Sequence, residues 1–376
     1  MRVLYPRYPQ LYGLPKIHKT GAPIRPIVSF YNTPLSALHK VLSTFLKPLT
    51  NSCLRLKDST ALMQHLDTTY SPTHPYHASL DVVSLYTSCD MRAARDIAID
   101  KFNVDPSLLP DNISVNTISS LINFCLDNSY FEYDNTFYSQ NSGGPMGSPL
   151  TVELAEIRTS YIEELALNTS PDPPNSYRHF VDDGLGDFRD RQHAETYLLF
   201  INSLSSDLQY TLEHPADDGS LPFLDVLIHP DKSTSVYRKP THTNLYLKYN
   251  SSTNNATKDS VIRSLTRRAY NLCSPQHLDA ELTTVYNICL SNGFPPQRTT
   301  TIMEQVKTKM ERRTTNLSHR QFKKLLNNDR SLKVSLPYHP TVGKPLKSLL
   351  NKHDIDVTYS SSPNLRSLLT LSLIHI

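Results

Sequence analysis

The chain has 376 residues, 38% of them hydrophobic, so it can bury large cores and is expected to divide into two or three lobes. The net charge of +3 is unevenly divided: residues 1–231 hold 16 Lys and Arg against 27 Asp and Glu, whereas residues 232–376 hold 22 against 8. This division is typical of a protein whose acidic part binds metal ions and whose basic part binds a polyanion. A basic tail on an ordinary soluble protein would explain it equally well. The five cysteines form no C-x-x-C pair, and no run approaches the ~20 apolar residues of a membrane span. These features argue against structural zinc and predict an intracellular protein with free thiols.

The residues before position 31 form a Pro-rich basic arm, with two short strands expected around a turn at Thr20 and Gly21. Residues 76–83 are expected to form a buried strand with a single acid, Asp81. Apolar periodicity predicts helices over residues 34–48, 58–67, 91–102, 114–128, 150–167, 192–208, 258–272 and 302–327.

Two further segments have the pattern of strands. Residues 177–188, YRHFVDDGLGDF, predict a hairpin whose turn uses Asp183 and Gly184, because Asp-Gly supplies the positive backbone angles of a tight turn. Residues 222–228 predict one strand.

The aspartates on these elements suggest a metal site. An acid on an apolar strand is costly, as are two adjacent acids on a tight hairpin, unless something offsets their desolvation. A pair of divalent cations held by Asp81, Asp182 and Asp183 would do so and would catalyse an in-line phosphoryl displacement. Taken alone, an Asp-Asp-Gly sequence is more often a polar surface turn.

Several motifs resemble those of reverse transcriptases in order and spacing. They are LDVVSLY at residues 80–86, the Gly-rich GGPMGSP at 143–149 and FVDD at 180–183. YGLPKIHK at 12–19, LPFLD at 221–225 and VYRKPTHT at 236–243 narrow the resemblance to Penelope-like retroelement reverse transcriptases, relatives of telomerase. The resemblance runs from about residue 11 to about residue 370.

The resemblance implies an α+β right-hand polymerase fold. It would have fingers at residues 1–75, shortened at the amino end, a palm of antiparallel sheet and helices at 76–232, and a basic helical thumb with a connector tail at 233–376. The endonuclease that such elements often carry is not expected. The implied activity is RNA-directed DNA polymerisation with two Mg²⁺ or Mn²⁺ ions, an RNA template, a DNA primer and deoxynucleoside triphosphates, in the nucleus.

Roles for individual residues follow from the same resemblance. Asp81 and Asp182 would bind the metal directly, with the carbonyl of Val82 contributing and Asp183 completing the cluster. The residues expected around the incoming nucleotide are Lys16, Arg25, Tyr86, Gly143, Met146, Gly147 and Ser148. Those expected against primer and template are Phe223, Leu224, Arg238, Lys239 and Lys248.

Two alternatives stay open at the level of sequence. One is a catalytically inactive, retroelement-derived nucleic-acid-binding protein; the other is an RNA-templated RNA polymerase, against which Tyr86 argues. The proton donor to pyrophosphate is also open, because residues 184–220 contain no Lys. Arg189, His193, His214 or water could take that role.

Overall fold

The computed structural model describes residues 6–16, 21–69, 73–315, 332–337, 342–352 and 355–360. The chain divides into two compact units. The first comprises Met1–Lys232 and Tyr237–Thr241, and the second comprises Ser233–Val236 and His242–Ile376.

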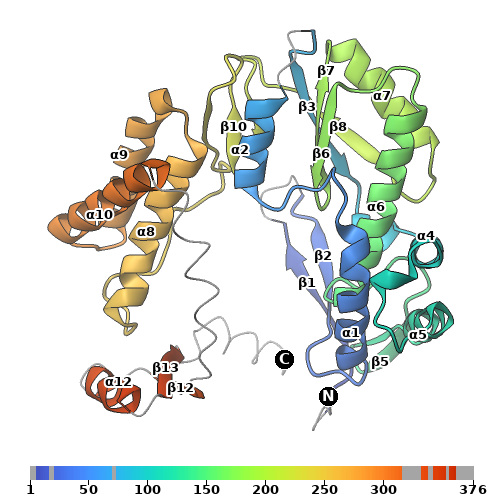
Figure 1. The fold of residues 1–376 in the computed structure, drawn as a ribbon, viewed down its shortest axis with the longest axis horizontal. Helices are drawn as coiled ribbons and strands as arrows, with labels where there is room; N and C mark the ends of the chain where they lie inside the picture. The colour runs from blue at the N-terminus through green and yellow to red at the C-terminus, as the bar shows by residue number, and fades with distance from the viewer. Residues whose placement is uncertain are drawn as a thin grey trace. The chain divides into compact units, whose positions relative to one another are not determined.

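A four-stranded antiparallel sheet lies at the centre of the first unit (Figure 1). In spatial order its strands are β6 (Ser176–Phe180), β7 (Asp183–Phe188), β3 (Tyr76–Val82) and β8 (Tyr210–Glu213). Asp81 pairs with Asp183 on one side and with Thr211 on the other. Because alternate residues of a strand point to opposite faces, Leu80 and Val82 enter the core while Asp81 faces away from it.

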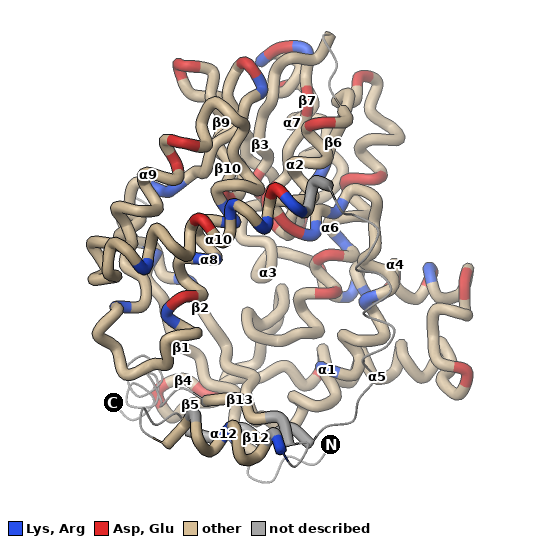
Figure 2. Tube along the Cα trace, turned by 60° about the vertical axis from the view of Figure 1, so that its left-hand side comes forward, with Lys and Arg blue, Asp and Glu red and all other residues tan. Residues whose placement is uncertain are grey.

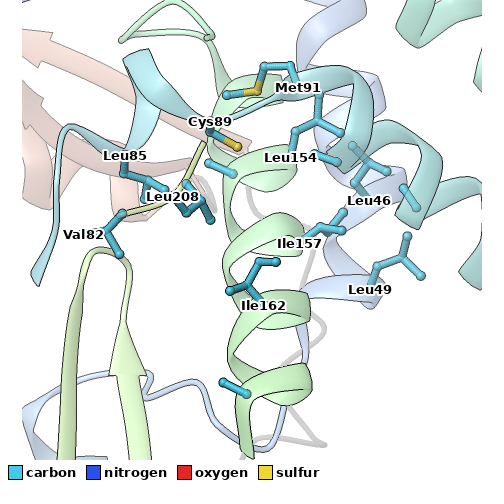
Figure 3. Close-up of a cluster of buried hydrophobic side chains, with 14 of the residues drawn as sticks. Leu46, Leu49, Val82, Leu85, Cys89, Met91, Leu154, Ile157, Ile162 and Leu208 are labelled. Atoms are coloured by element: carbon cyan, nitrogen blue, oxygen red, sulfur yellow. The ribbon is translucent and has the colours of Figure 1, made fainter. Parts of the chain in front are cut away.

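Helices form one hydrophobic core with the apolar face of this sheet: α1 (Ser36–Leu46), α3 (Leu85–Ser88), α4 (Met91–Val104), α5 (Val115–Asp127), α6 (Pro149–Thr169) and α7 (Arg191–Ser203). Helix α2 (Ser59–Thr68) lies on the other side of the sheet, where His65 approaches Ser176 (Figure 1). Figure 3 shows α6 between Val82 and Leu85 on one side and Leu46 and Leu49 on the other. A helix enclosed in this way has no wide polar face, and residues on every side of α6 are buried.

A second sheet in the same unit has the order β2-β1-β4-β5. Its strands are β1 (Gln10–Pro15), β2 (Ile24–Ser29), β4 (Tyr130–Tyr133) and β5 (Thr136–Ser139). The predicted arm hairpin is therefore present, whereas β4 and β5 were not predicted. The aromatic runs YFEY and TFYS on either side of Asp134 and Asn135 are the usual signal of a hairpin with a tight turn. Val28 donates its N–H to the carbonyl of Met146, which fastens the Gly-rich loop to β2.

The prediction of one strand over residues 222–228 was wrong. The segment is a hairpin of β9 (Leu221–Phe223) and β10 (Val226–Ile228), in which Phe223 pairs with Val226. Leu224 occupies the turn with a φ of +55°. Asp225 completes the turn, and this single charged residue within an apolar run was the available signal for it.

The turn predicted for the aspartate hairpin, the hairpin over residues 177–188, was also wrong, because the turn lies two residues earlier in the chain. Phe180 pairs with Asp183, so Val181 and Asp182 form the turn, and Val181 has a φ of +59°. This conformation is an outlier for a β-branched residue and costs of order 1–3 kcal/mol, a strain found most often at functional sites. Gly184 instead lies within β7, where a Cβ would collide with the phenol of Tyr177.

The second unit is mainly helical. Its elements are β11 (Thr234–Val236), α8 (Asn255–Leu272), α9 (Pro275–Ser291), α10 (Pro296–Thr315), β12 (Leu332–Pro337), α12 (Gly343–Asn351) and β13 (Ile355–Ser360). Helix α9 was not predicted, although Ser274 followed by Pro275 is a typical helix start. Helix α10 begins six residues before the predicted 302–327, and residues 316–327 of that prediction lie outside the described residues. Lys and Arg recur along α8 and α10 (Figure 2).

No described helix is both long enough and apolar enough to cross a membrane.

Candidate functional site

A cavity of about 870 Å³ brings the three predicted aspartates together in the first unit. Asp81 reaches it from β3, Asp182 from the turn and Asp183 from the start of β7. The N–H of Val82 donates to the carbonyl of Asp182 over 2.9 Å, so the turn is tied to the strand that carries Asp81. A polar surface turn alone does not explain this arrangement, because Asp81, from a strand distant in the sequence, lines the same cavity as the two aspartates of the turn region.

The charge of this cluster is costly without a cation. Burial, followed by the charges of Asp182 and Asp81, raises the pKa of Asp183 from 3.8 to about 6, while Lys239 acts in the opposite direction. Carboxylate oxygens are the ligands that Mg²⁺ prefers, so the donor set fits a divalent cation.

The three aspartates do not form a closed metal-binding group in these side-chain conformations. Within the part of the chain that the structure describes, no three His, Cys, Asp or Glu side chains stand close enough to hold a metal. Asp182 is exposed at the turn, so its side chain can rotate towards Asp81 and Asp183 without disturbing the core.

Three cationic side chains line the same cavity: Lys16, Arg25 and Lys239. Arg25 is on β2, paired with Leu14, and Lys16 follows β1. The N–H of Lys16 donates to the carbonyl of Pro23, which closes the arm hairpin beside the cavity. An acidic wall therefore faces cations that could hold a phosphorylated ligand.

Tyr86 lies in α3, half-buried, lining the cavity while packing against the core. Its carbonyl accepts the N–H of Gly144, which connects it to the Gly-rich loop. Burial and, next, the charge of Asp182 raise the pKa of its phenol, so this hydroxyl stays protonated.

The Gly-rich loop contributes only part of its predicted residues to the cavity. Met146 and Gly147 line it, whereas Gly143 and Ser148 are not among its walls. A Cβ on Gly143 would strike the backbone of Thr87, so this glycine permits close packing. Ser148 is buried: its hydroxyl caps α6 and lies 2.7 Å from Nδ1 of His39.

The remaining predicted residues lie elsewhere. Phe223 is buried in β9, Leu224 forms the turn after it, and Arg238 is half-buried; none of the three lines the cavity. Lys248 belongs to the second unit.

None of the three side chains considered as proton donors lines the cavity. Arg189 pairs with Asp172, whose main-chain carbonyl lies 3.1 Å from Nε2 of His193. His214 lies 2.8 Å from the Tyr76 hydroxyl.

Among the cavity residues that were not predicted are Thr211 and Glu213 on β8. Both stand on the face of the sheet that carries Asp81 and Asp183. The alternation of apolar and polar residues over Tyr210–Glu213 was the available signal for this strand. The helix predicted over 192–208 gave no reason to expect that the following segment would pair with β3.

Comparison with known proteins places the fold. Telomerase from Candida albicans, solved with the TWJ fragment of telomeric RNA, is 12% identical over 85% of this chain and 60% of that one, with a TM-score of 0.56. Candida tropicalis telomerase truncated from its C-terminal domain is 14% identical over 63% and 56%, with a TM-score of 0.45. The BmCPV RNA-dependent RNA polymerase at quiescent state is 11% identical over 76% and 26%, with a TM-score of 0.47.

The similarity to the Candida albicans telomerase shows an α+β fold of the nucleic-acid polymerase type. The chain spans about three fifths of the telomerase chains that it matches. A family model described as an animal helix-turn-helix domain matches residues 245–304, which include α8 and α9. No curated protein matches the sequence.

Proposed function

We propose that this chain is an RNA-directed DNA polymerase of the Penelope-like retroelement kind, extending a DNA primer on an RNA template inside the nucleus. The observation that carries the proposal is the shared cavity of Asp81, Asp182 and Asp183, opposite Arg25 and Lys16. Its fingers would be residues 1–75, its palm 76–232 and its thumb 233–376.

Two divalent cations, Mg²⁺ or Mn²⁺, would activate the primer 3′-hydroxyl and stabilise the pyrophosphate as it leaves. Asp81, Asp182 and Asp183 would hold them, with the carbonyl of Val82. The guanidinium of Arg25 and the ammonium of Lys16 would bind the triphosphate and stabilise charge that develops on it.

The other walls of the cavity would bind the rest of the nucleotide. Tyr86 would lie beneath the sugar and exclude a ribose 2′-hydroxyl, while Met146 and Gly147 would border the base. Lys239, whose charge acts on Asp183, would serve the reacting phosphates more directly than the nucleic-acid backbone. Phe223, Leu224, Arg238 and Lys248 would contact primer and template outside the cavity.

A primer-extension assay tests the proposal. We expect wild-type protein to add deoxynucleotides to a DNA primer on an RNA template with Mg²⁺ or Mn²⁺, and Asp182→Asn to abolish addition because it removes a charged ligand without changing shape. The matched control is Asp217→Asn, an exposed loop aspartate outside the cavity, which should leave addition unchanged.

Extension by Asp182→Asn at the wild-type rate would refute the metal assignment. Wild-type protein that binds primer-template but never extends it would instead favour an inactive nucleic-acid-binding protein.

A further inference from the structure

A histidine lies between two buried glutamates directly below the aspartate turn. Nε2 of His179 is 2.8 Å from Oε1 of Glu156, and its Nδ1 is 2.5 Å from Oε2 of Glu163. All three side chains are at most 3% exposed. A ring nitrogen that faces a carboxylate oxygen is best satisfied when it carries a proton, so this arrangement favours the imidazolium form of His179. Burial opposes that charge, but the charge of Glu163 and the hydrogen bonds to both glutamates outweigh it and raise the pKa of His179 to about 10.

Two further side chains complete the cluster. The Tyr177 hydroxyl donates to Oε1 of Glu163 over 2.8 Å, and Nε of Arg55 lies 3.2 Å from Oε1 of Glu156. Two cations and two carboxylates balance, so this cluster carries no net charge. The main chain reinforces it, because His179 donates its N–H to Leu54 and accepts that of Leu56.

The cluster joins two elements that lead to opposite walls of the cavity. Both glutamates are on α6, which begins at Pro149, just after Met146 and Gly147, and whose Thr151 also lines the cavity. His179 and Tyr177 are on β6, which ends at Phe180, immediately before the turn. On β6 the cluster therefore reaches almost to the turn, and on α6 Glu156 lies one turn after Val152, which also lines the cavity.

We infer that His179 is a positioning residue: by holding β6 to α6 through Glu156 and Glu163, it sets the distance between the aspartate turn and the Gly-rich loop. The consequence for nucleotide addition rests on the proposed function. His179 touches neither metal nor substrate in this role.

Stability alone is a poor reason for such a cluster. Well-packed apolar residues often replace a buried ion pair with no loss of stability, whereas an ion pair fixes one relative position of its elements. A strained turn at Val181 needs such a support, because positive φ at valine persists only where its surroundings enforce it.

The same helix supplies a matched control. Glu153 is also buried, one turn before Glu156, but its hydrogen bonds come from Ser43 over 3.1 Å and from Thr50 over 3.4 Å, both of which lie outside the hairpin. Glu153→Gln and Glu156→Gln are therefore equal chemical changes on one helix, of which only the second loosens the support of the turn.

The experiment compares His179→Gln, Glu156→Gln and Glu153→Gln by thermal stability, Mn²⁺ binding followed by electron paramagnetic resonance, and single-nucleotide kinetics. For His179→Gln we expect about tenfold weaker Mn²⁺ binding, the size usual for residues that orient metal ligands, and a kcat lowered about 100-fold with primer-template Kd unchanged. Glu156→Gln should show a smaller loss in the same direction. Glu153→Gln should keep wild-type Mn²⁺ binding and kcat even where its Tm falls as far.

The inference would be overturned if Mn²⁺ binding and kcat fell in proportion to Tm in all three variants. It would also be overturned if Mn²⁺ binding were unchanged in both His179→Gln and Glu156→Gln. Should His179→Gln fail to fold, the pair Glu156→Gln and Glu153→Gln decides the question. A wild-type protein that binds Mn²⁺ yet extends no primer would refute the proposed polymerase, while the Mn²⁺ measurements would still judge the positioning role.

Discussion

At the scale of single residues, Asp183 lies beside two other carboxylates, so its ionised form is unfavourable when no cation is bound. Its folded pKa of about 6 exceeds the ordinary 3.8, so the folded protein retains the proton more tightly than the unfolded chain between these values. Above pH 6 the ionised carboxylate destabilises the metal-free fold.

We therefore expect Asp183→Asn to stabilise the metal-free protein above pH 6, by about 1–2 kcal/mol once solvent screening of this half-buried group is discounted. The gain should shrink as pH falls from 6 towards 3.8, because the wild-type carboxyl then becomes neutral too. Thermal melts in chelator at a series of pH values measure it, with Asp217→Asn as the control. Saturating Mg²⁺ should reverse the order, since it stabilises the wild type that binds it; a gain independent of pH would contradict the electrostatic explanation.

Tyr86 both lines the cavity and packs on the core, so its two possible roles can be separated by experiment. If the ring blocks a ribose 2′-hydroxyl, Tyr86→Val should raise ribonucleotide incorporation by a large factor with a modest loss of deoxynucleotide kcat/KM. Single-nucleotide incorporation of both sugars by both proteins measures the ratio. Lower Tm with an equal loss for both sugars would assign Tyr86 to the core alone.

At the scale of elements, the aspartate hairpin depends on a glycine for packing rather than for its turn. A Cβ at Gly184 would meet the phenol of Tyr177, which is 2% exposed and bonded to Glu163, so the phenol cannot easily move. Gly184→Ala should cost about 1–3 kcal/mol by overpacking, measured as a fall in Tm or in denaturation midpoint.

A second variant checks the cause of this loss. Tyr177→Phe removes the hydroxyl nearest the new methyl group, so the double variant should lose less stability than the two single variants added together. Strict additivity would mean that the cost of alanine arises elsewhere.

At the scale of the whole molecule, the uneven charge predicts how nucleic acid binds. Residues 232–376 hold 22 Lys and Arg against 8 Asp and Glu, and Lys307 is exposed on α10. Primer-template affinity should fall steeply with salt, with a slope of about 0.9 per neutralised phosphate.

Lys307→Glu should weaken binding to any sequence alike and reduce that slope by about one, because backbone contacts carry no base information. Fluorescence anisotropy over a salt series measures both. Arg92→Glu, an equal charge change at an exposed residue of α4, is the control and should leave the slope unchanged. If the primer-template affinity of the wild type did not change with salt, the charge of residues 232–376 would have no role in nucleic-acid binding.

The sequence by itself determined the α+β class, most helices and the identity of the three aspartates, because these depend on local periodicity and on motifs whose spacing is fixed along the chain. It did not determine the turns of the two short hairpins. Val181 and Leu224 adopt positive φ against their own preference, and only surrounding contacts can enforce that.

The composition of the site was likewise settled only by tertiary structure. Thr211, Glu213 and Lys239 join Asp81 because β8 pairs with β3 and the segment after β11 returns to the first unit. The alternation over Tyr210–Glu213 indicates a strand but not the strand with which it pairs. His179 carries no distinctive motif either. Its surroundings arise because β6 packs on α6, so the pairing of its ring with two buried carboxylates exists only in the folded chain.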